Sequence, residues 1–75
     1  MKPSQVRMAR AALNWSLQTL ADASRIHRNT ISNFEVGRFA GDPATIAAIR
    51  AALESAGVEF IAENGGGPGV RLRKP

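Results

Sequence analysis

The sequence of 75 residues contains no cysteine, one histidine and few aromatic residues. Without cysteine the chain has neither a disulfide framework nor a thiolate metal site, and a reducing cytoplasm is its natural setting. His27 has no second histidine or acidic cluster at ligand spacing, and the six acids form no recognisable pairing of nucleophile and base. We therefore expect no metal, no cofactor and no catalytic residues.

Long apolar runs are also missing. No run approaches the roughly 20 residues of a membrane span, and the N-terminal stretch MKPSQVRMAR lacks the apolar segment of a secretory signal. Positive charge, in contrast, is in excess, because ten Lys and Arg stand against six Asp and Glu and give a net charge of +4. A small basic domain attracts polyanions, most often nucleic acid. These features predict a soluble cytoplasmic protein without a membrane partner.

Cap residues and helical spacing of apolar side chains predict four helices, at about residues 5–13, 17–24, 28–36 and 43–56. Ser4 is the expected N-cap of the first helix and Ser16 of the second. Asp42 followed by Pro43 is a strong start signal for the fourth. Gly37 is placed to end the third helix as a C′ glycine.

The tail changes from helical to alternating spacing. Residues 58–63 and 70–73 alternate and flank the glycine-rich segment 64–69, which predicts a two-stranded hairpin. Because isolated hairpins are marginal in water, its apolar face should lie against the helices or against another chain. The expected organisation is a mainly α fold, with a helical domain at 1–57 and a hairpin extension at 58–75.

The third predicted helix has two distinct faces. Ile31 and Phe34 lie three residues apart and should point into the core, which leaves the opposite face exposed. That face carries Arg28, Asn29, Ser32 and Asn33. Arginine can pair with guanine and asparagine with adenine, so this face suits base edges in DNA. The alternative is a solvated polar face, which every surface helix has.

The whole stretch resembles the helix-turn-helix domain of the phage repressor and Cro class over about residues 6–53. This class is a large family of small bacterial regulators that includes the controller proteins of restriction–modification systems. The matching residues are Trp15-Ser16, Leu20-Ala21, Ile26, Thr30-Ile31-Ser32, Phe34-Glu35, Gly37 and the Pro43 helix with Ile46 and Leu53. The resemblance implies a four-helix repressor/Cro-like fold and a homodimeric transcriptional regulator that binds double-stranded DNA at an inverted-repeat operator.

The resemblance also assigns roles to residues. The candidate base contacts are Arg28, Asn29, Ser32 and Asn33, and the candidate backbone contacts are Ser16, Arg25, His27, Thr30 and Arg38. Glu35 stands where the family has an acid that pairs with a basic residue of the first helix, and Arg10 is placed to be its partner. Arg7 is expected to be a solvated surface charge.

Three positions depart from the family pattern. Leu17 replaces a glutamine that touches DNA, Arg25 replaces a turn glycine, and His27 replaces a capping Ser or Thr. Arg25 must therefore adopt a left-handed conformation at some cost or use a different turn. Exposed apolar side chains at Leu17, Phe39 and Val36 would favour an alternative function on the same fold, namely binding another protein as an antiactivator. An antitoxin that docks its partner through the basic segment 71–74 is a third hypothesis.

Overall fold

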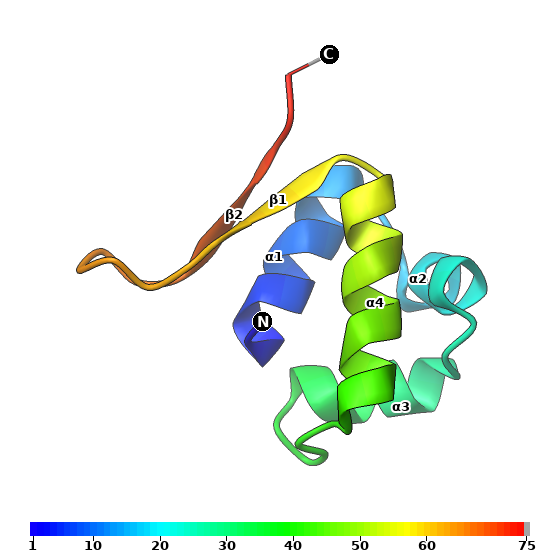
Figure 1. Cartoon of the computed structure of the whole chain (residues 1–75). Coiled ribbons are helices and arrows are strands. Elements are labelled where there is room, and N and C mark those ends of the chain that lie inside the picture. The colour runs from blue at the N-terminus through cyan, green and yellow to red at the C-terminus, as the bar shows by residue number, and fades with distance from the viewer. Residues whose placement is uncertain (75) are drawn as a thin grey trace.

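The computed structural model describes residues 1–74. Within them the chain forms four helices followed by a two-stranded antiparallel hairpin (Figure 1). The elements are α1 Pro3–Leu13, α2 Leu17–Ser24, α3 Arg28–Glu35, α4 Pro43–Ser55, β1 Val58–Ile61 and β2 Gly69–Leu72. The predicted mainly helical fold with a C-terminal hairpin is confirmed. Pro75, the last residue of the expected extension, lies outside the described residues.

The first helix begins at Pro3, and Ser4 is not its N-cap. Lys2 holds that position with extended backbone (φ −98°, ψ 156°), and Pro3 follows at N1, where its missing N–H leaves no hydrogen bond unmade. Oε1 of Gln5 accepts a hydrogen bond from the Lys2 N–H at 2.7 Å and closes the first turn. The prediction at Ser4 was wrong because it gave weight to the hydroxyl and none to the proline before it.

Side-chain caps fix the starts of the other three helices at the predicted places. The bonds run from Thr19 N–H to Ser16 Oγ (3.0 Å), from Asn29 N–H to His27 Nδ1 (3.1 Å) and from Thr45 N–H to Asp42 Oδ1 (2.7 Å). Gly37 follows α3 with φ 81°, a left-handed conformation that favours glycine and turns the chain away from the helix axis.

The cap of α4 should make stability depend on acid pH. The backbone N–H and side chain of Thr45 donate hydrogen bonds that hold the pKa of the Asp42 carboxyl below its ordinary value. A lowered folded-state pKa stabilises the fold above the ordinary pKa, and this stabilisation is lost as pH falls through the folded value. In urea unfolding we expect Asp42→Ala to be less stable than the parent at pH 7, and the difference to shrink below about pH 4. Asp42→Asn, which can cap the helix but does not titrate, is the control. If the difference in stability between the parent and Asp42→Ala does not change with pH, the Asp42 carboxylate is not the source of the stabilisation.

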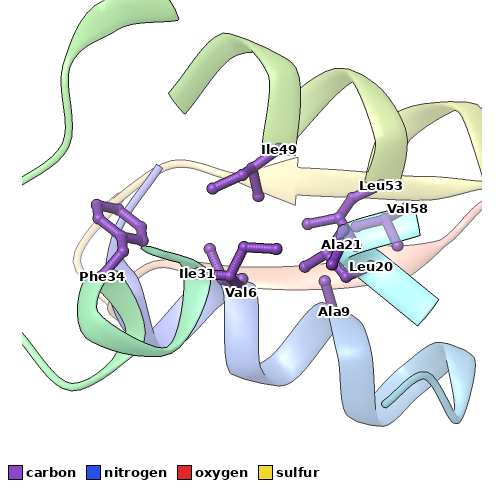
Figure 2. Packing of buried hydrophobic residues seen from close by; sticks show 9 residues of the cluster. All are labelled: Val6, Ala9, Leu20, Ala21, Ile31, Phe34, Ile49, Leu53 and Val58. Atoms are coloured by element: carbon purple, nitrogen blue, oxygen red, sulfur yellow. The ribbon is translucent and has the colours of Figure 1, made fainter. Parts of the chain in front are cut away.

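One apolar core joins all four helices and the first strand (Figure 2). Its buried members are Val6 and Ala9 of α1, Leu20 and Ala21 of α2, Ile31 and Phe34 of α3, Ile49 and Leu53 of α4, and Val58 of β1. Since Ile31 and Phe34 anchor α3 from one side, the opposite side of that helix must face solvent. The core thus decides which residues of α3 are available to a partner.

One buried polar side chain ties the hairpin to α1. Ile61 and Gly69 are opposite each other in the β1–β2 ladder. Gln5 is 4% exposed, and its Nε2 donates to the carbonyl of Ile61 at 3.1 Å and to that of Gly69 at 3.0 Å. The loop end of the hairpin extends away from the helices (Figure 1). Val58 lies in the core and Phe60 and Val70 pack against it, so apolar side chains of the hairpin lie against the helices.

Candidate nucleic-acid interface

The turn between α2 and α3 sets the angle at which α3 crosses the molecule. Arg25 adopts the left-handed conformation (φ 61°, ψ 27°), the first of the two options that the sequence left open. Its N–H bonds to the carbonyl of Ala21 at 2.8 Å, and the Ile26 N–H donates to Ser24 Oγ at 3.2 Å. These bonds hold a conformation that costs a non-glycine residue about 1 kcal/mol or more. Arg25 thus closes the turn in a conformation that glycine adopts more readily.

The outer face of α3 carries the candidate base contacts. Arg28, Asn29 and Asn33 are exposed, whereas Ser32 is half-buried. Thr30, a candidate backbone contact, is also half-buried. His27 is exposed, and its Nδ1 accepts the Asn29 N–H and caps the helix. The face presents one guanidinium and two amides side by side along about one and a half turns.

A shallow groove of about 400 Å³ separates α2 from the start of α3. Arg25, His27 and Arg28 all line it, so the structure brings together two candidate backbone contacts and one candidate base contact. Asp22 is the acidic residue of the groove, and its Oδ1 accepts a hydrogen bond from Gln18 Nε2 at 2.9 Å. Ser16, at the start of α2, and Arg38, after α3, lie beyond this groove and are exposed.

An ion pair behind α3 fixes the helix to α1. Arg10 Nε and Nη2 donate to the two carboxylate oxygens of Glu35 at 2.7 and 2.8 Å, a bidentate geometry. Glu35 is 4% exposed, and its hydrogen bond raises the pKa of the Arg10 guanidinium. Arg10 Nη1 also donates to the Trp15 carbonyl at 3.1 Å. Both side chains are engaged within the fold, which leaves neither for DNA.

Arg7 is not a free solvated charge. Although it is exposed, its Nη1 donates to the backbone carbonyl of Glu35. A guanidinium at the C-terminus of α3 donates to a carbonyl that has no hydrogen-bond partner within the helix. Its positive charge also complements the helix dipole. Sequence analysis missed this role, although Arg7 lies three residues from Arg10 and thus on the same side of α1.

Three of the eight arginines pair with glutamates, three around α3 form no ion pair within residues 1–74, and Arg7 and Arg73 donate to the backbone carbonyls of Glu35 and Glu54. Arg10, Arg50 and Arg71 each pair with a glutamate, at 2.7, 3.1 and 3.3 Å respectively. Arg25, Arg28 and Arg38 are exposed and form no ion pair with any residue in the range 1–74. All three belong to the α2–α3 turn, to α3 or to the loop after it. These three arginines place positive charge without an ion-pair partner in the described part of the chain around the outer face of α3.

The apolar side chains expected at this surface are mostly covered. Leu17 and Phe39 are half-buried and pack against the core, so the expectation that they are exposed was wrong. The loop after α3 lies close to α4, because a Cβ on Gly41 (φ 83°) would meet Ile46 at 2.8 Å. Val36 alone of the three expected side chains remains exposed, at 62%.

A short helix held across its predecessor by the core, with exposed Arg and Asn side chains and unpaired arginines around it, defines a helix-turn-helix DNA-binding domain. A family model described as helix-turn-helix, of the Cro/C1 type, matches residues 6–60. The chain belongs to this family, which is one of DNA-binding transcription regulators and not of enzymes. Comparison with curated proteins gives no match.

Within residues 1–74, no helix combines the length and the apolar character that crossing a membrane requires. In the same range, no group of three His, Asp or Glu side chains is arranged to hold a metal ion.

Proposed function

We propose that this protein is a sequence-specific transcriptional regulator of the bacterial cytoplasm that binds an inverted-repeat operator as a homodimer, with α3 in the major groove. The observation that carries the proposal is the outer face of α3, where Arg and Asn side chains suited to base edges lie among three exposed arginines that form no ion pair within residues 1–74. The buried anchors Ile31, Phe34 and Glu35 hold that face outward. A rigid, correctly presented face lowers the entropy lost on binding.

Base recognition falls to the polar side chains at the start and middle of α3. The Arg28 guanidinium can donate two parallel hydrogen bonds to O6 and N7 of guanine, and the Asn29 and Asn33 amides can each pair with N6 and N7 of adenine. Ser32, half-buried beside them, has room for a single hydroxyl contact. The predicted half-site therefore contains guanine and adenine within a few base pairs.

Phosphate contacts would surround these base contacts. The first backbone N–H groups of α2 and α3, next to Ser16 and His27, lie at the positive ends of the helix dipoles and can donate to phosphate oxygens. Arg25 and Arg38 add full charges on either side of α3, and Thr30 adds a hydroxyl. Such contacts position the protein on the duplex without reading sequence.

A homodimer would place two copies of α3 roughly 34 Å apart, one helical turn of DNA. The exposed parts of α4 and of the hairpin are the elements available for the contact between subunits. An inverted repeat with half-sites one turn apart follows from the twofold symmetry of such a dimer.

Selection from a random-sequence DNA pool, together with a light-scattering mass of the complex, tests the proposal. Enrichment of an inverted repeat that binds two copies would support it. A folded protein that enriches no sequence at low salt would overturn it and lead to a pull-down for a protein partner.

Single substitutions on α3 should separate base contacts from backbone contacts. Arg28→Ala and Asn29→Ala should each weaken binding to the selected site by roughly 1–3 kcal/mol and leave the melting temperature nearly unchanged, because both side chains are exposed. Titrations of selected and scrambled DNA, with calorimetric unfolding of the free protein, measure both quantities.

The matched control for these variants is Arg38→Ala, which should lower affinity for all sequences alike and reduce the salt slope by about one. Arg71→Ala, which removes an arginine already paired with Glu59 on the hairpin, should leave DNA affinity unchanged. Parent-like binding by the Arg28 and Asn29 variants would mean that another face reads the bases.

The alternative function, a protein-binding module, has less support from the structure than it had from the sequence. Two of the three apolar side chains that motivated it, Leu17 and Phe39, pack against the core. Salt separates the two functions, because affinity that depends on phosphate contacts falls steeply with ionic strength, whereas an apolar protein interface survives.

A further inference from the structure

Val36 is the most exposed large apolar side chain among residues 1–74, with 62% of its surface accessible. It occupies the C-cap of α3 with near-helical backbone (φ −98°, ψ 5°). Counting back along the helix, Asn33 and Asn29 lie three and seven residues earlier, the spacing of one helical face. Val36 therefore continues the row of side chains that the proposed function assigns to base reading.

Most of the Val36 surface stays open to solvent in the described fold. Gly37 follows it in the left-handed conformation, and a Cβ at Gly37 would meet no atom within 4 Å. The chain thus turns away directly after Val36 and leaves it at the open end of the face. Since Leu17 and Phe39 pack inward, Val36 is an isolated apolar side chain among polar ones. One isolated side chain is far smaller than the patch of several hundred Å² that marks a protein interface.

The edges of base pairs in the major groove carry one apolar group, the C5 methyl of thymine. A valine has no hydrogen-bonding group, so the methyl is the feature of a base edge that it can recognise. We propose that Val36 is a specificity-determining residue that contacts a thymine methyl in each half-site. This inference rests on the proposed function, because it requires α3 to lie in the major groove.

The helix geometry gives the place of that thymine. Three residues of α-helix correspond to a rise of about 4.5 Å, a little more than the ~3.4 Å between successive base pairs. The contacted methyl therefore lies one or two base pairs beyond the pair that Asn33 reads, on the side away from the Arg28 contact.

The experiment compares thymine with deoxyuridine, which pairs identically but lacks the methyl. In the site selected from the random pool, each thymine is replaced singly and the dissociation constant is measured for the parent and for Val36→Ala. Burial of one methyl group predicts a loss of about fourfold for the parent at one position of the half-site. Val36→Ala should bind thymine and deoxyuridine equally at that position. Circular dichroism verifies that the variant is folded.

Asn33→Ala is the matched control. It should lower affinity for the whole site while keeping the fourfold difference between thymine and deoxyuridine at the Val36 position. A second readout replaces that thymine by cytosine and by 5-methylcytosine, and the methylated base should be preferred by the parent and not by Val36→Ala.

The failures of the two proposals are distinguishable. An enriched site whose deoxyuridine penalties are the same for parent and Val36→Ala overturns the role of Val36 and leaves DNA recognition standing. A half-site without thymine at that place does the same. If no DNA site is enriched, and a protein partner is instead lost on Val36→Ala, both proposals are overturned.

Discussion

Glu35→Gln is expected to lower the free energy of unfolding by about 3–5 kcal/mol, the usual effect of removing one member of a buried ion pair. Glu35 is 4% exposed and accepts two hydrogen bonds from Arg10. Glutamine keeps the shape but removes the charge, and its NH₂ group would meet a guanidinium that can only donate. The Arg10 charge is then left largely uncompensated between α1 and α3.

The size of this effect is large for a chain of 75 residues, whose total stability is roughly 4–11 kcal/mol. Urea unfolding followed by circular dichroism measures it directly. Arg10→Gln should cost at least as much as Glu35→Gln, because the Glu35 side chain that it leaves behind is 5% exposed, whereas the Arg10 side chain is 20% exposed. A second consequence concerns function: α3 loses its anchor to α1, and DNA affinity should fall with stability.

Glu59→Gln is the matched control, since it also removes a glutamate from an arginine pair. Glu59 and Arg71 are 41% and 68% exposed in their side chains, and their closest atoms are 3.3 Å apart. Water screens such a pair, so the expected change is below about 1 kcal/mol. Equal losses in the two variants would mean that burial does not set the strength of the Arg10–Glu35 pair.

Much of this fold could be predicted from the sequence because its signals are local. The start of α2 depends on Ser16 and that of α4 on Asp42 and Pro43, within a few residues of the bonds that they make. The faces of α3 followed from the spacing of Ile31 and Phe34. Local caps and periodicity therefore predicted all four helices, apart from the start of α1, and the orientation of the α3 face.

The remaining contacts depend on residues distant in sequence. Arg7 reaches a carbonyl 28 residues away, and Gln5 reaches carbonyls 56 and 64 residues away. Phe39 packs against a core whose members come from other elements of the chain. The sequence around these residues does not predict such partners, because each contact forms only when the elements pack together. The assignment of Glu35 to Arg10 came from a family resemblance and not from the residues themselves.

Gln5→Glu is expected to destabilise the fold by about 2–4 kcal/mol at pH 7, because two donated hydrogen bonds are lost and their carbonyl partners face a carboxylate. The Gln5 side chain is buried, with its Nε2 about 3 Å from the oxygens of Ile61 and Gly69. A carboxylate oxygen at that place repels both carbonyls, and the hairpin should separate from α1. Hydrogen exchange of the β1 and β2 amides should rise with the loss of stability.

The pH dependence of Gln5→Glu separates charge from the simple loss of a donor. The new carboxyl would lie next to carbonyl oxygens and away from water. Its pKa in the folded state should therefore be raised. Its penalty is then greatest above that pKa and is relieved as pH falls through it, where the neutral acid can donate one hydrogen bond again. Gln5→Met, which has a similar shape and no donor, is the control and should show a smaller loss that does not change with pH. If the Glu and Met variants lose equal stability at every pH, the Gln5 amide does not hold the hairpin by donating to Ile61 and Gly69.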